Sequence, residues 1–141
     1  MKSLRLICLL LVVMTGCATV TPYQSEQTGG GYIDLPLSEG RYNISVRGNG
    51  WTDRQHVYNI AQVRAAEITL ANGKTHFLIL DSGEKEKNHT EYTAQQFTNV
   101  KNHYVKLVIK PTNDASLEGA IDARAKIRDL GPLVGYMEKI K

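Results

Sequence analysis

The stretch TDRQHVYNIAQVRAAEITLANG, from Thr52 to Gly73, carries the strongest secondary-structure pattern in the chain. Thr52 with Gln55 three residues later matches a capping box, and Asp53 suits the positive end of a helix. Asn72-Gly73 is a typical helix end. The stretch therefore predicts an amphipathic helix. Its core-facing residues recur at three- and four-residue steps: Val57, Ile60, Ala61, Arg64, Ala65 and Ile68, widened by Val63 and Leu70.

Segments on both sides of this helix have strand patterns. Arg41 to Gly48 alternates apolar and polar residues, which predicts a half-buried strand that ends at Gly48-Asn49-Gly50. His76 to Asp81, HFLILD, is a continuous apolar run typical of a central strand. His103 to Lys110 alternates again and stops at Pro111.

The region between the last two strands has a weaker pattern. Ser82 to Asn88 is polar and predicts a loop or a strand end in solvent. Thr90 to Val100 fits a weak edge strand, and Asn99 to Asn102 predicts a turn.

A second helix is predicted near the C-terminus, with its cap at Asn113 to Ser116 and its end at Gly131-Pro132. The element order is β-α-β-(β)-β-α, and the helix between the first two strands favours a parallel pair. The expected fold is an α+β two-layer sandwich, in which a small mixed sheet has both helices on one face. The apolar residues of the second helix are Leu117, Ala120, Ala123, Ile127 and Leu130.

The N-terminus reads MKSLRLICLLLVVMTGC from Met1 to Cys17. Two cations, a short apolar run and small residues are the three parts of a secretory signal, and the run is too short to span a bilayer. Met14-Thr15-Gly16-Cys17 resembles the lipobox of bacterial lipoproteins. That resemblance implies cleavage before Cys17 and acylation of Cys17. The alternative is an ordinary secretory signal with an incidental cysteine.

The expected domain organisation follows from this leader. Residues 1–16 are the signal peptide, and residues 17–40 are the lipidated cysteine with a flexible tether, because TPYQSEQTGGGY has no apolar period. Residues 41–132 form the α+β domain, and residues 133–141 form a C-terminal tail. Tyr23 and Tyr32 are interpreted as solvated tether residues, with contact to the domain as the alternative.

Charge and cysteine content restrict the possible functions. Removal of Lys2 and Arg5 with the leader leaves 15 basic against 14 acidic residues, scattered along the chain. No nucleic-acid-binding patch is expected from this distribution. With Cys8 discarded and Cys17 lipidated, no disulfide is possible in the mature chain.

Three segments together resemble a family of small proteobacterial lipoproteins. They are RYNISVRGNG (Arg41–Gly50), VRAAEITLANG (Val63–Gly73) and AIDARAKIRDLGP (Ala120–Pro132). The leader, Thr21-Pro22-Tyr23 and the glycine-rich segment match as well. The resemblance covers nearly the whole chain except Gly83 to Lys101 and the residues after Pro132. It implies a single anchored domain and transfers no catalytic residue, because the family has no assigned biochemical function.

The best candidate for a small-ligand site is the turn that carries Arg47, Asn49, Trp51 and Asp53. Helix N-termini attract anions, and an arginine can add a bidentate contact. The alternative is that this is an ordinary turn, with Trp51 covering the edge of the core.

Other candidate groups are weaker. His56, His76, His89 and His103 have no metal-ligand spacing, although His76 and His103 could meet across strands. Arg64 and Glu67 are interpreted as a structural pair or a snorkelling arginine, with a polar pair under a pocket as the alternative.

No serine lies in a nucleophile frame, and no metal, cofactor or catalytic residue is expected. The sequence thus predicts a non-enzymatic lipoprotein that serves as an interaction or structural module with an envelope protein partner. Ala18 and Thr19 after the cysteine resemble the outer-membrane class, facing the periplasm. The alternative function is a periplasmic ligand-binding or enzymatic domain that uses the Arg47–Asp53 turn.

Overall fold

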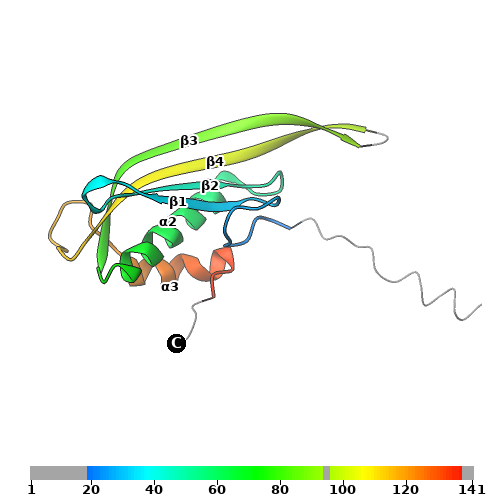
Figure 1. Cartoon of the computed structure of the whole chain (residues 1–141). Coiled ribbons are helices and arrows are strands. Elements are labelled where there is room, and N and C mark those ends of the chain that lie inside the picture. The colour runs from blue at the N-terminus through cyan, green and yellow to red at the C-terminus, as the bar shows by residue number, and fades with distance from the viewer. Residues whose placement is uncertain (1–18, 94–95, 138–141) are drawn as a thin grey trace, which may run out of the picture.

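The computed structural model describes residues 19–93 and 96–137, which form one antiparallel sheet with two helices (Figure 1). The strand order across the sheet is β1-β2-β4-β3-β5. In chain order the elements are β1 (Gly31–Pro36), a short 3-10 helix η1 (Ser38–Gly40), β2 (Tyr42–Arg47), α2 (Arg54–Ala71), β3 (His76–Thr93), β4 (Gln96–Thr112), β5 (Ile121–Asp122) and α3 (Ala123–Val134).

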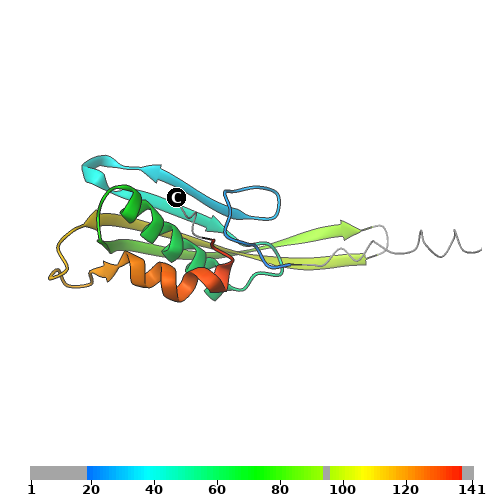
Figure 2. The same ribbon diagram turned by 90° about the horizontal axis from the view of Figure 1, so that it is seen from below.

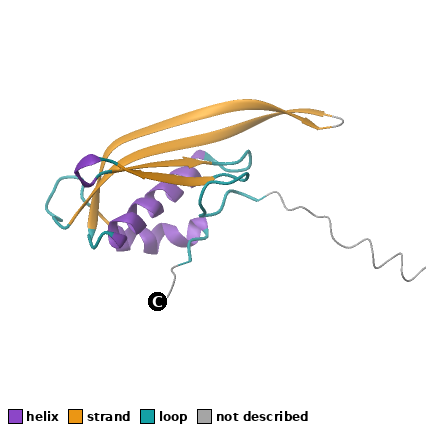
Figure 3. Ribbon diagram, viewed as in Figure 1, coloured by secondary structure: helices purple, strands orange, loops and turns teal. Residues whose placement is uncertain are grey.

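Both helices lie on the same face of the sheet, so the predicted α+β two-layer sandwich is confirmed (Figures 2 and 3). The predicted mixed sheet is wrong, because every pair of named strands in the described part is antiparallel. Strand β4 hydrogen-bonds between β2 and β3. The two strands that α2 connects therefore run in the same direction, as expected for a crossover, but they are not neighbours.

The core lies between the sheet and α2. Alternate residues of β2 and β4 point toward the helices, as their sequence alternation predicts. Helix α2 is buried over much of its circumference because the sheet covers one side and α3 packs beside it (Figure 2). The fully buried side chains include Ile44, Val57, Ile60, Val63, Phe77, Leu107 and Ile109.

The N-terminus of α2 differs from the predicted capping box. Asp53 is the N-cap residue, and its Oδ1 accepts a hydrogen bond from the His56 backbone N–H at 2.8 Å. Gln55 instead donates to Asn59 within the helix. Thr52 is one residue too early for the cap and binds elsewhere, as described below. The predicted helix end at Asn72-Gly73 is confirmed, since Gly73 has a φ of 68°.

Helix α3 begins later and ends later than predicted. Asp122 caps it by accepting from the Ala125 N–H, so the polar segment 113–116 is not its cap. Pro132 lies inside the last turn, where it has no N–H to donate to the carbonyl of Arg128, yet the helix continues to Val134. Val134 is buried, so residues 133–136 belong to the domain and are not a separate tail.

The segment predicted as a flexible tether is part of the folded domain from residue 19 onward. Strand β1 pairs with β2 over its whole length, and Thr21 is completely buried. The glycines form a tight turn: Gly30 has a φ of 95°, and a Cβ there would lie 2.4 Å from the Arg47 carbonyl oxygen. Glycine is thus needed here for close packing, although its run resembled a linker in the sequence.

Of the two alternatives predicted for Ser82 to Asn88, a loop or a strand end in solvent, the structure has the strand end, whereas the turn predicted at Asn99 to Asn102 is absent because β4 runs through it. Strands β3 and β4, 18 and 17 residues long, form a hairpin that projects beyond the rest of the domain (Figure 1). Their pairing is continuous except for a bulge between Ile79 and Asp81. Residues 82–90 are exposed and need no core, which explains why this segment has no apolar strand pattern.

Candidate functional site

The face of the sheet opposite the helices carries a concave feature. It is a groove of about 460 Å³ that crosses β1, β2, β4 and β3, and it is called the open-face groove below. Its position follows from strand alternation, since the residues on one face of β2 and β4 pack on α2 and their neighbours face away. Its lining comprises Glu26, Ile33, Ser45, Val46, Arg47, Gly83, Glu84, Lys85, Tyr104, Val105 and Lys106.

Charged side chains surround an aromatic and aliphatic floor in this groove. Arg47 Nε donates to Glu26 Oε1 at 2.6 Å, and its Nη2 donates to the Gln27 carbonyl at 2.7 Å. Lys87 lies over the ring of Tyr104 at 5.3 Å from the ring centroid. Ile33 on β1 is 49% exposed. The groove thus offers apolar contact area with charges of both signs at its edge.

The predicted ligand turn does not assemble as a single site. Arg47 lines the groove and is already paired with Glu26. The Asn49 side chain donates to the Thr19 carbonyl at 2.9 Å and accepts from the Trp51 N–H at 3.0 Å. Asp53 caps α2. The described structure therefore gives the polar groups of this turn internal partners.

Trp51 does not cover the edge of the core, contrary to the alternative interpretation of this turn. It is 69% exposed, the second highest value among the exposed large apolar residues of the described chain after Met137. Its neighbour Thr52 is buried and hydrogen-bonds to Thr21 instead of capping α2. The exposed indole thus contributes little to the stability of the domain.

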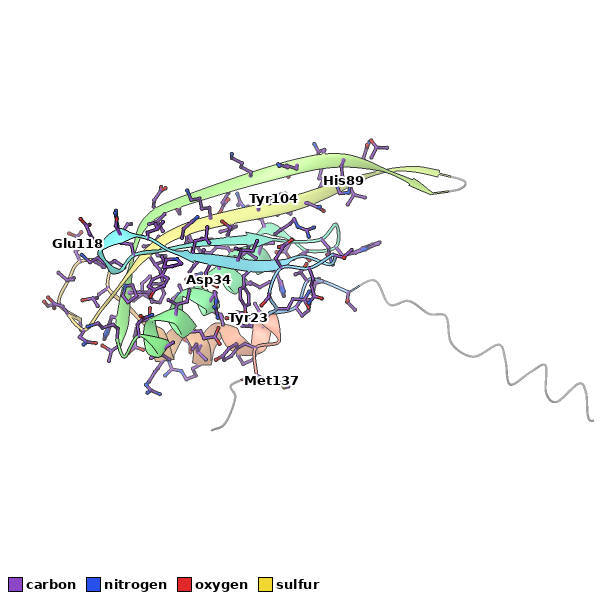
Figure 4. The ribbon with its side chains drawn as sticks, viewed as in Figure 1. Tyr23, Asp34, His89, Tyr104, Glu118 and Met137 are labelled. Carbon is purple, nitrogen blue, oxygen red and sulfur yellow. The ribbon has the colours of Figure 1, made fainter. Side chains whose placement is uncertain are left out.

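A second polar cluster joins the N-terminal segment, residues 19–30, and β1 to α2 (Figure 4). Arg64 Nε donates to Asp34 Oδ1 at 2.8 Å, and Arg64 also pairs with Glu67. The Tyr23 hydroxyl donates to the same Glu67 carboxylate. The Arg64 guanidinium lies 4.5 Å from the ring centroid of Tyr32. The interpretation of Arg64 as paired with carboxylates is confirmed.

The electrostatics of this cluster favour a structural role. Burial raises the pKa of Tyr23 far above its ordinary value, and its hydrogen bond to Glu67 raises it further. For Arg64, burial alone lowers the pKa, but the hydrogen bonds to Asp34 and Glu67 outweigh it and leave the pKa raised. Both groups are locked in their ordinary protonation states at neutral pH, so neither is suited to proton transfer.

The histidines are placed apart. His56 Nε2 lies 2.8 Å from the Thr21 carbonyl oxygen, and His76 is 4.0 Å from Asp122. His76 lies opposite Thr112 and His103 opposite Glu86, so these two histidines do not meet across the strands. Within residues 19–93 and 96–137, no group of three or more acidic, histidine or cysteine side chains could hold a metal ion.

Comparison with known proteins adds no further constraint on this site. No protein-family model matches the chain, and no curated protein or solved structure matches it either. Cys17 and the leader lie outside the described residues. Among the helices that are described, none has the length and apolar character to cross a membrane.

The sequence had identified Arg47 as a candidate, but most of the groove was missed. The sequence places Ile33 in a tether, and Gly83, Glu84 and Lys85 in a polar segment that is a loop or a strand end. Their contribution depends on β1 and β3 joining the sheet on either side of β2 and β4. The alternating polar residues of GEKEKN (residues 83–88) were the only local sign of this arrangement.

Proposed function

We propose that this chain is a lipid-anchored protein of the bacterial envelope, attached through Cys17, whose domain is a non-enzymatic protein-interaction module. The open-face groove is the surface that binds the partner. The proposed location is the outer membrane, with the domain facing the periplasm.

The leader supports the anchor. Its charged start, short apolar run and small residues before Cys17 match a lipoprotein signal, and the segments 41–50, 63–73 and 120–132 resemble a lipoprotein family. Acyl chains on one cysteine provide membrane affinity at about 0.8 kcal/mol per buried CH₂, so several chains attach a water-soluble domain durably.

The observation that carries the interaction role is that no helix of the described residues covers one face of the sheet. Sheets in two-layer domains can leave one face to solvent, but that face is then usually polar. Here Ile33 and Leu35 on β1 are about half exposed, and residues of β2, β4 and β3 line the groove beside them. Apolar area surrounded by charges is typical of protein-binding surfaces.

A small-ligand role is the second candidate, because a volume near 460 Å³ is within the range of small-molecule pockets. Arg47 would supply the charge from the turn that the sequence singled out. Its pairing with Glu26 weakens this candidate, since a ligand must displace an existing hydrogen-bonded ion pair.

Photo-cross-linking in intact cells tests the interaction role. A photoreactive residue at Ile33 in the full-length protein is expected to capture one partner in a fixed ratio, whereas the same residue at Leu117 should not. Leu117 is a matched control because it is also exposed but lies in the loop before β5. Equal capture of the same species at both positions would contradict a specific role for the groove.

Membrane fractionation tests the anchor separately. The wild-type chain is expected in the membrane fraction and the Cys17→Ala variant in the soluble fraction. A Cys17→Ala protein that remains with the membrane would contradict attachment through Cys17.

A further inference from the structure

The buried N-terminal segment fixes how far the domain can lie from Cys17. Thr21 is completely buried and donates its backbone N–H to Thr52 Oγ1 at 2.7 Å. Its hydroxyl donates to the Gly29 carbonyl at 2.8 Å and accepts from the Asn49 N–H at 2.9 Å. Cys17 is four residues before Thr21. Even fully extended, four residues span at most about 14 Å.

Trp51 lies beside this entry point. Asn49 connects the two, because its side-chain amide donates to the Thr19 carbonyl at 2.9 Å while its Oδ1 accepts from the Trp51 N–H at 3.0 Å. Trp51 is 69% exposed, and Val20 in the N-terminal segment is 45% exposed. Among the aromatic side chains whose exposure the structure describes, Trp51 is the most exposed, and it lies two residues from Asn49, which holds Thr19.

The chemistry of an indole fits a bilayer surface. Tryptophan has a large apolar body and one N–H donor, so it is favoured at the level of the lipid headgroups, where one part meets acyl chains and the other meets water. A domain held within about 14 Å of the lipidated residue brings this side chain to that level without a further tether.

We propose that Trp51, together with Val20, contacts the lipid bilayer beside the acyl anchor and fixes which end of the domain faces the membrane. This inference rests on the proposed lipidation of Cys17. The binding energy comes from the acyl chains, and Trp51 contributes orientation. The loop before β5, which contains Glu118, then lies at the end of the domain away from the membrane (Figure 4).

The test uses the fact that Trp51 is the only tryptophan in the chain. The full-length lipidated protein is reconstituted into phosphatidylcholine vesicles with or without brominated acyl chains, which quench only nearby indoles. We expect a blue-shifted emission and about twofold quenching, as for a side chain buried 5–10 Å into the interface. Emission that is unquenched while the protein floats with the vesicles would overturn the inference.

Two variants make the result specific. In Trp51→Phe/Leu117→Trp, the indole moves to the loop before β5, and we expect no quenching although the protein still floats with the vesicles. Equal quenching of both proteins would overturn the orientation.

The Cys17→Ala protein is expected neither to float nor to be quenched. If the wild-type protein itself does not float, the proposed anchor fails, which is distinguishable from flotation without quenching.

Discussion

Arg64 is the residue on which the attachment of β1 to α2 depends most. It neutralises two carboxylates, Asp34 and Glu67, and its own side chain is 21% exposed. Arg64→Ala would leave both acids partly buried without a counter-ion. We expect a loss of about 2–3 kcal/mol in the free energy of unfolding, less than the 3–5 kcal/mol typical of a fully buried pair.

Urea denaturation of wild type and variant measures this loss. Arg41→Ala is the matched control, because the Arg41–Glu39 pair is 3.8 Å long and Glu39 is largely exposed. It should change the free energy of unfolding by less than about 1 kcal/mol. Equal effects of the two substitutions would contradict the importance of the Arg64 cluster.

The raised pKa of Tyr23 predicts how the free energy of unfolding changes at alkaline pH. Its pKa is raised in the folded state by burial and by Glu67, whereas an unfolded tyrosine titrates near pH 10. Below pH 10 both states keep the proton, and stability is unaffected by this group. Above pH 10 the unfolded chain releases the proton and the folded chain keeps it, so stability falls, by up to about 1.4 kcal/mol per pH unit.

The comparison variant for this prediction is Tyr23→Phe, which keeps the ring contacts with Tyr32 and Tyr136 but cannot titrate. Urea midpoints recorded from pH 8 to pH 11 should fall less steeply for Tyr23→Phe than for wild type. Parallel curves would show that the hydroxyl is not protected from ionisation in the folded state.

At the scale of elements, the residue that caps α2 differs between the sequence prediction and the structure. The capping box predicted a role for Gln55, but Asp53 accepts the hydrogen bond that caps the helix. Asp53→Ala should lower the free energy of unfolding by about 1 kcal/mol, the usual loss for an N-cap. Gln55→Ala should be nearly neutral, since Gln55 donates only to Asn59. Thermal or urea unfolding of both variants checks this. A larger loss of unfolding free energy for Gln55→Ala than for Asp53→Ala would support the predicted capping box instead.

The outer edge of β3 raises the question of self-association. In the described sheet, β5 pairs only with His76 and Phe77, so the rest of this edge has no strand beside it. If two copies paired antiparallel about a two-fold axis, directly opposite residues would lie on the same face of the sheet. An even-numbered residue would therefore face another even-numbered residue, and an odd-numbered residue another odd-numbered one. When residue 84, 85 or 86 lies on the axis, the opposite pairs include Glu84 with Glu84, Lys85 with Lys85, or Lys85 with Lys87, respectively, and each of these is unfavourable.

This charge pattern predicts that removing the lysines promotes dimers. Lys85→Thr/Lys87→Thr replaces two edge charges with strand-forming residues, and sedimentation velocity should then show a concentration-dependent dimer. Lys74→Thr/Lys110→Thr removes the same charge away from this edge and should stay in the state of the wild type. A dimer formed equally by both variants would point to lowered net charge as the cause.

The elements that sequence reasoning found are those that bury a periodic apolar face. Helix α2 and the inner parts of β2, β3 and β4 pack on one another, so their period is visible locally. Strand β1 was missed, and the projecting hairpin was predicted only in part, as a strand end and a weak edge strand, because edge pairing and solvent-exposed pairing need no apolar period. The candidate site was missed for the same reason: Arg47 was identified, but the groove residues on β1 and β3 become neighbours only through the sheet.

At the scale of the whole molecule, one end of the domain gathers the features that concern the membrane. The N-terminal end of the described chain and the projecting β3–β4 hairpin lie at the same end in both views (Figures 1 and 2). From His103 to Gln96, β4 continues past its last pairing with β2 near Arg47 and Tyr104. At about 3.3 Å per residue, this part of the hairpin extends roughly 23 Å. A lipidated Cys17 would therefore bring the hairpin toward the bilayer together with Trp51.

A change in the length of the anchor tests this arrangement. A Gly-Ser spacer of about 12 residues after Ala18 would lengthen the chain before Thr21 to about 16 residues, with a root-mean-square reach near 22 Å. Neutron reflectometry of the lipidated proteins on a supported bilayer should show the wild-type domain directly against the headgroups and a water-filled gap only with the spacer. A flexible 24-residue tether, as residues 17–40 suggested, would already give a gap of roughly 27 Å in the wild type. The hydrogen bonds of Thr21 hold the N-terminal segment against the domain and allow no such separation. A wild-type gap of that size would therefore mean that this segment detaches from the domain when the protein is at the membrane.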